Sequence, residues 1–154
     1  MSRREKTPVL ANITTGYRLR RSQRGAALVE FALILPCLLL LLFGIIEFSI
    51  ALYDKAVITN ASREAARAGI VYAVPQLTVA QIESVATSYC ISNLITFGSA
   101  ASPSVSVTQS SGTSTGNPLT VTVSYTFGGM VLGKSFNPVP NALQLTASTT
   151  MNYE

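Results

Sequence analysis

Hydrophobic and polar residues are distributed unevenly along this chain, and the longest apolar stretch lies near its start. Residues 31–46 contain no charged side chain, and residues 26–52 contain only Glu30 and Glu47. As a helix the longer stretch extends about 40 Å, enough to cross a hydrocarbon core of about 30 Å. Its centre is apolar on every side, which is typical of a helix in lipid. The pattern predicts a membrane-spanning helix over residues 26–53.

Pro36 lies inside this predicted helix, and Gly44 follows it. Proline removes one helical hydrogen bond and clashes with the preceding turn. In membrane helices, neighbouring groups re-satisfy the freed carbonyl. We therefore expect Pro36 to bend the helix rather than break it.

A helical pattern continues beyond the apolar stretch, through residues 54–69. Small and apolar side chains recur there at three- or four-residue spacing, at Tyr53, Val57, Ala61, Ala65 and Ala68. Polar side chains fall beside or opposite this stripe, at Asn60, Arg63, Glu64 and Arg67. Two interpretations stay open: a solvated face of a long helix, or a subunit-contact face where small residues let another helix approach. Gly69 is expected to cap or bend the helix, and Pro75 to end any continuation.

The next segment predicts a second helix. Thr78 and Gln81 have the spacing of a capping box, which marks a helix start. Apolar side chains then recur on one face, at Ile82, Val85, Ala86 and Tyr89. We expect this helix over residues 79–94.

The last third of the chain has the pattern of strands. Residues 119–127 alternate strictly between apolar and polar side chains, and residues 143–149 alternate more weakly. A short alternation occurs at residues 105–107, and turn residues at 128–129 and 137–140 mark loops. The fold class expected is therefore α+β: a long N-terminal membrane-spanning helix extending into a small head, with a second helix and a two- or three-stranded antiparallel sheet.

The charge of the chain is split between two parts, although the overall net charge is +4. Residues 1–25 carry seven basic residues and one acidic residue, whereas residues 26–154 carry four basic and six acidic residues. The basic character thus belongs to the leader and does not indicate a nucleic-acid binder. By the positive-inside rule the leader stays in the cytoplasm. The apolar stretch runs into a helical pattern without an Ala-x-Ala site and polar mature start, which disfavours an ordinary secretory signal.

The leader and the apolar run meet in a distinctive order. The leader ends in Arg24 and Gly25, and a carboxylate, Glu30, stands five residues after the glycine. Carboxylates in membrane helices are costly and are functional candidates by default. This order resembles the processing site of type IV prepilins. The alternative is a plain signal anchor with a stray acidic residue.

The resemblance extends beyond the junction. Residues 24–48, together with the Asn-x-x-Arg-Glu-x-x-Arg segment at residues 60–67, look like the TadE-like family of tight-adherence (Flp) pilus systems. Residues 145–154 resemble the usual last strand of that family more loosely. Family members are minor pilin-like or pseudopilin proteins, which a dedicated prepilin peptidase processes.

The resemblance implies a role for each junction residue. Gly25 and Ala26 would flank the cleaved bond, and Glu30 would be read by the peptidase or pair with the N-terminal ammonium of a neighbouring subunit. Phe31 falls where many pilins place an aromatic residue. The implied regions are a cleaved leader (1–25), a transmembrane helix (26–53) and an extracytoplasmic head (54–154).

The head has little catalytic equipment. The chain has no histidine, and the only carboxylates after Ala68 are Glu83 and Glu154. We therefore expect neither an enzyme nor a metal site, cofactor or small-molecule substrate. Cys37 falls in the membrane segment and Cys90 in the head, so the two are not expected to pair, and burial is the favoured state of Cys90.

These observations favour a minor pilin or pseudopilin in the assembly of a tight-adherence pilus. The protein would be a single-pass protein of the inner membrane, with its N-terminus in the cytoplasm. Its partners would be membrane lipid, the prepilin peptidase, and other pilin and TadE-like subunits. The main alternative is an uncleaved, signal-anchored envelope protein of a secretion machine. A membrane-tethered enzyme is the least favoured class.

Overall fold

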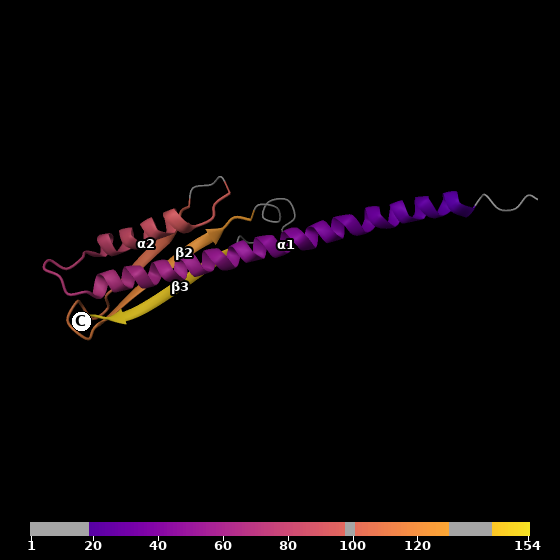
Figure 1. Ribbon diagram of the computed structural model, residues 1–154. Helices are drawn as coiled ribbons and strands as arrows, with labels where there is room; N and C mark the ends of the chain where they lie inside the picture. Colours follow the sequence, from indigo (N-terminus) through magenta and orange to yellow (C-terminus); the bar gives the residue numbers. More distant parts are fainter. Residues whose placement is uncertain (1–18, 98–100, 130–142) are drawn as a thin grey trace, which may run out of the picture. The chain divides into compact units, whose positions relative to one another are not determined.

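The computed structural model describes residues 19–97, 101–129 and 143–154. In chain order these residues form two helices and three strands: α1 (Leu19–Ile70), α2 (Val79–Asn93), β1 (Ser104–Thr108), β2 (Pro118–Phe127) and β3 (Leu143–Asn152) (Figure 1). The α+β prediction is confirmed, and the sheet has three strands. The chain divides into two compact units, Met1–Leu41 and Leu42–Glu154.

The described part of the first unit is the N-terminal half of α1. Its apolar side chains project outward, and Leu28 and Leu33 are each 70% exposed. The helix continues through Pro36. The proline therefore does not break the helix, as its membrane-type surroundings led us to expect.

The second unit contains the rest of α1, α2 and the antiparallel sheet in the order β1-β2-β3. β2 pairs with β1 from Thr120↔Thr108 to Ser124↔Ser104. It pairs with β3 along its whole length, from Pro118↔Asn152 to Phe127↔Leu143. The short alternation at residues 105–107 thus becomes an edge strand, and β3 runs three residues further than its sequence pattern predicted.

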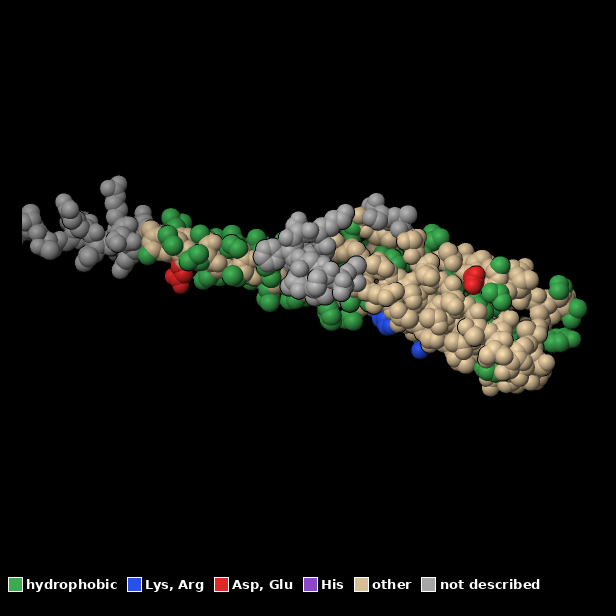
Figure 2. Space-filling view, turned by 180° about the vertical axis from the view of Figure 1, so that it is seen from behind, with side chains coloured by type: hydrophobic (Ala, Val, Ile, Leu, Met, Phe, Trp, Pro, Cys, Tyr) green, Lys and Arg blue, Asp and Glu red, His purple; other side chains and the backbone are tan. Residues whose placement is uncertain are grey.

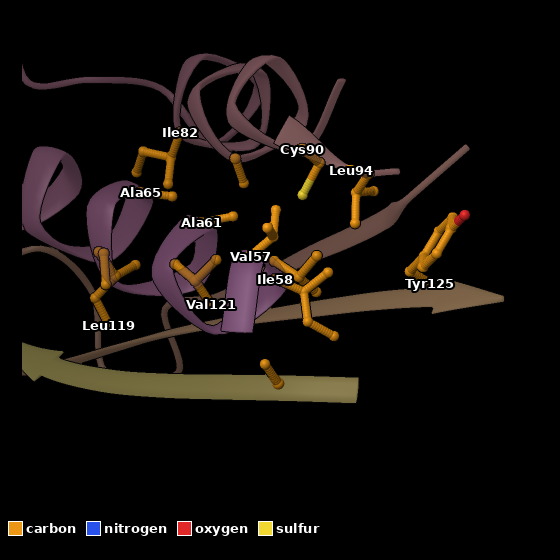
Figure 3. Packing of buried hydrophobic residues seen from close by; sticks show 14 of the residues in the cluster. Val57, Ile58, Ala61, Ala65, Ile82, Cys90, Leu94, Leu119, Val121 and Tyr125 are labelled. Carbon is orange, nitrogen blue, oxygen red and sulfur yellow. The ribbon is translucent and has the colours of Figure 1, made fainter. Parts of the chain in front are cut away.

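The core of this unit lies between the sheet and the two helices. Alternate side chains of β2 are buried: Leu119, Val121, Val123, Tyr125 and Phe127. On the other face of β2, Thr120, Thr122 and Ser124 pair with hydroxyl groups of β3, for example Thr120 Oγ1 with Thr150 Oγ1 at 2.8 Å. Figure 3 shows side chains of α2, including Ile82 and Cys90, lying against α1 above β2. Strict alternation on β2 therefore separates one apolar face, which the helices cover, from one polar face.

The alanines of α1 let the elements approach each other closely. Ala61, Ala65 and Ala66 are completely buried. Gly69 is also within α1, which ends at Ile70, so it does not follow the helix as a cap; the other expectation, a bend at Gly69, stays a prediction. A Cβ atom at Gly69 would lie 2.6 Å from Leu119 Cδ2 and 2.8 Å from Ile82 Cδ1. Side chains of β2 and α2 thus reach the helix backbone at Gly69, and a larger residue there would force Leu119 or Ile82 to shift.

The second helix begins as the capping box predicts. Gln81 N–H donates to Thr78 Oγ1 and Thr78 N–H donates to Gln81 Oε1. Ile82, Ala86 and Cys90 form the buried face, and Leu94 is the C-cap. The helix therefore ends one residue before the predicted end. The loop predicted at residues 137–140 lies outside the described residues.

Candidate membrane and subunit-contact sites

The apolar surface of α1 is the first candidate site. The segment Gly25–Ile70 is long and apolar enough to cross a membrane, and it is the one such helix in the described part of the chain. Figure 2 shows apolar side chains along the exposed part of this helix. The finding supports single-pass membrane anchoring.

The four junction residues lie on α1. Gly25, Ala26, Glu30 and Phe31 are all helical and exposed. Nothing lies within 4 Å of the position of a Cβ atom at Gly25. Ala26 and Glu30 are four residues apart, so both fall on one side of the helix.

The polar residues of the TadE-like pattern form one exposed face of α1. Asn60, Arg63, Glu64 and Arg67 recur at helical spacing, and all four are exposed. We call these four residues the polar face of α1. The buried alanines lie on the opposite side of the helix and contact α2 and the sheet of the same chain. Val57, Ala61 and Ala65 of the small-residue stripe are therefore covered within the chain, whereas the polar face is exposed.

Asp54 is a buried carboxylate whose environment the sequence did not reveal. It is 0% exposed, and its Oδ1 accepts a hydrogen bond of 3.0 Å from the Ile95 N–H. Its Oδ2 is buried and has no hydrogen-bond partner among the described residues. Asp54 thus ties α1 to the chain just after α2. The one sequence signal was its spacing, since Asp54 precedes the buried Ile58 by four residues and Ala61 by seven.

Two further contacts tie α1 to β3. Ser62 Oγ and Thr149 Oγ1 are 2.7 Å apart, and Lys55 Nζ donates to the Thr146 carbonyl at the sheet edge. These contacts make α1 an integral part of the head from Asp54 onward.

Burial also affects the titration of two groups in the core. Burial raises the pKa of Tyr125, and the negative charge of Asp54 raises it further. Burial raises the pKa of the Cys90 thiol to about 11. Both cysteines are free, with Cys37 exposed and Cys90 buried, which confirms that they do not pair. A thiol with a raised pKa is a poor nucleophile at neutral pH.

No group of three or more His, Cys, Asp or Glu side chains that could hold a metal ion occurs among the described residues. The described residues form surfaces instead: an apolar helix, a carboxylate near its start and an exposed polar face further along. Such an arrangement can anchor a protein and contact other helices.

A comparison with known protein families identifies part of α1. Residues 25–67 match the family described as TadE-like protein, which confirms the resemblance seen in the sequence. The match covers Gly25, Glu30 and the polar face of α1, and it ends before α2 and the sheet. It associates the chain with tight-adherence (Flp) pilus systems. No curated protein and no solved structure matches the chain.

Proposed function

We propose that this protein is a minor pilin or pseudopilin of a tight-adherence pilus, processed by the prepilin peptidase of that system. The observation that carries the proposal is the position of the junction. Gly25 stands at the first residue of the TadE-like match, directly before an apolar helix with Glu30 near its start.

Processing would free the N-terminus without releasing the protein from the membrane. Cleavage between Gly25 and Ala26 removes the leader and leaves the apolar part of α1 on the product. The new ammonium of Ala26 then lies at the start of the membrane helix. A secretory signal is cut on the other side of its apolar region, so it does not give such a product.

Glu30 supplies the charge that matches this ammonium. Burying an isolated carboxylate in lipid is costly, and a neighbouring ammonium offsets the cost only at the correct axial position. A subunit in the wrong register would leave both charges unpaired. The pair would therefore set the register between adjacent subunits.

The charge distribution supports an orientation with the leader in the cytoplasm. The leader carries a net charge of +6, and the remaining residues carry −2. If the more basic side is retained in the cytoplasm, the head would lie outside it and the helix would cross the inner membrane. The polar face of α1 would there contact other pilin and TadE-like subunits, and the head would have a structural rather than a catalytic role.

An uncleaved envelope anchor is the second candidate. It is favoured by the continuity of α1 from Leu19 through Gly25, because no extended segment marks the cleavage site. In this case the basic leader would stay on the protein and no new ammonium would form.

N-terminal sequencing distinguishes the two candidates. The full-length protein is purified from cells that contain the cognate prepilin peptidase and from cells that lack it. We expect a start at Ala26 in the first preparation and an uncut leader in the second. An uncut leader in both preparations would contradict processing and support the anchor.

A further inference from the structure

Apolar side chains are exposed at the end of the head where α1 enters it. They come from α1, from the end of α2 and the residues after it, and from the start of β3. Their exposed fractions are 47% for Tyr53, 61% for Ile91, 39% for Ile95, 38% for Phe97 and 51% for Leu143. We call these five residues the basal apolar surface. No charged residue occurs in residues 91–97 or 143–145.

The position of α2 along α1 shows why its end belongs to this surface. Gly69, near the end of α1, lies against Ile82, near the start of α2. Asp54 bonds to Ile95, just after α2. The two helices are therefore antiparallel, and the chain at residues 91–97 returns to the level of Asp54.

β3 runs in the opposite sense to α2, and its start reaches the same end. Lys55 contacts Thr146, Ser62 contacts Thr149, and Glu154 N–H donates to the Ile70 carbonyl at 3.4 Å. The strand thus runs parallel to α1. Leu143 precedes Thr146 by three residues, which places it about 10 Å closer to the N-terminal end of α1.

The bilayer thickness places this end of the head at the membrane surface. Twenty helical residues span about 30 Å, the thickness of the hydrocarbon core. Counted from Phe31, the first residue after Glu30, they end at Ile50. The headgroup region adds about 5–7 Å on each side, or about three to five helical residues. Tyr53, and Ile95 beside Asp54, fall at this level.

We propose that the basal apolar surface lies in the headgroup region of the bilayer that α1 crosses, so that the head is docked on the membrane. Lipid is the occupant because the surface continues the exposed apolar side chains of α1, Phe48 and Leu52. Tyrosine, represented here by Tyr53, is enriched in this region. The proposal requires only that α1 spans the membrane and is independent of cleavage at Gly25.

The opposite end of the head also exposes apolar side chains, but it lacks this continuity. Val71, Tyr72 and Val74 follow α1 and are 48%, 73% and 83% exposed. Ile70 is twenty residues beyond Ile50, or about 30 Å along a helix. One membrane surface cannot cover both ends, so this loop serves as the matched control.

The chain has no tryptophan, so a single substitution provides a clean fluorescent probe. Phe97→Trp probes the basal apolar surface, Tyr72→Trp probes the opposite end, and Phe43→Trp probes the membrane span. Each full-length protein, with its leader, is reconstituted at high lipid excess into phosphatidylethanolamine–phosphatidylglycerol vesicles. The vesicles contain either ordinary lipids or lipids brominated near the top of the acyl chain, and acrylamide probes exposure to water. Circular dichroism verifies folding, and Ile91→Trp replaces Phe97→Trp if the latter does not fold.

We expect brominated lipid to remove most of the fluorescence of the Phe97→Trp protein and little of that of the Tyr72→Trp protein. Acrylamide should quench the Tyr72→Trp protein strongly and the Phe97→Trp protein weakly. Acrylamide could instead quench the Phe97→Trp protein as strongly as the Tyr72→Trp protein, while brominated lipid quenches the Phe43→Trp protein. This result would show that α1 spans the membrane but that the head is not docked on it. Protection of Phe97→Trp from both quenchers would assign the surface to another protein copy and overturn the proposal.

Discussion

At the scale of single residues, Asp54 shows how one buried polar group can hold two elements together. Its Oδ1 satisfies the Ile95 N–H, while its Oδ2 has no partner. The hydrogen bond stabilises the junction of α1 with the end of α2, and the unpartnered oxygen opposes that stabilisation. The net effect of a substitution at Asp54 on stability depends on whether it removes the hydrogen-bond acceptor or the negative charge.

Two substitutions at Asp54 separate these contributions. Asp54→Ala leaves the buried Ile95 N–H unsatisfied, and we expect the free energy of unfolding of the head to fall by about 1–3 kcal/mol. Asp54→Asn keeps an acceptor oxygen and removes a buried charge, and an unpartnered amide costs less than an unpartnered carboxylate. We expect it to be at least as stable as the original protein. Chemical unfolding of each full-length variant in detergent, followed by near-ultraviolet circular dichroism, measures its free energy of unfolding. An equal loss of stability in the two variants would show that the charge itself stabilises the head.

At the scale of secondary-structure elements, local rules explain each helix and strand, but the contacts between them depend on small residues in α1. The alanine positions and Gly69 allow α2 and β2 to approach the helix. One of the two interpretations that the sequence left open was a contact of these small residues with another subunit, but the buried alanines pack against α2 and the sheet of the same chain. The polar face of α1 stays exposed.

Gly69→Ala tests how closely these elements pack. The added methyl group would lie 2.6 Å from Leu119 Cδ2, and overpacking of a core costs about 1–3 kcal/mol. Better helix propensity returns up to about 1 kcal/mol. We expect a net loss of stability in thermal unfolding. Gly128→Ala is the matched control, because nothing lies within 4 Å of its Cβ position; equal stability of the two variants would contradict close packing at Gly69.

At the scale of the whole molecule, one chain combines a membrane helix, a carboxylate near its start and a head built on the same helix. The TadE-like match spans the first two features and the polar face of α1. In the proposed function, Glu30 acts only when subunits meet. Its role is therefore visible in assembly rather than in the isolated protein.

Glu30→Gln keeps the shape of the side chain and removes its charge. Loss of one partner of a buried ion pair costs about 3–5 kcal/mol, so we expect loss of co-purification with other pilus subunits and fewer surface pili. Membrane levels should stay normal, because a neutral residue enters the bilayer more easily than a charged one. Quantitative pull-down and electron microscopy measure these effects. Glu47→Gln is the control for loss of a carboxylate elsewhere in the apolar stretch. Normal pili in cells with the Glu30→Gln variant would show that the Glu30 carboxylate has no role in assembly.

The sequence by itself determined the features that depend on neighbouring residues. The apolar stretch gives α1, the Thr78–Gln81 spacing starts α2, and the alternation at residues 119–127 gives β2. Each follows from short-range backbone geometry and side-chain periodicity. The junction at Gly25 and the TadE-like pattern are also local, so they could be recognised without a structure.

Only the tertiary structure decided which residues far apart in the sequence lie in contact. The sequence did not reveal the surroundings of Asp54 and Gly69, which come from residues 13 to 50 positions away: Ile82 and Leu119 beside Gly69, and Ile95 beside Asp54. It also did not reveal that β3 lies alongside α1, where Ser62 contacts Thr149, 87 positions away. Antiparallel packing of α2 and parallel placement of β3 bring three distant segments to one end of the head. Periodicity identifies an apolar face but not the element that covers it, because that choice depends on how the whole chain buries its apolar surface.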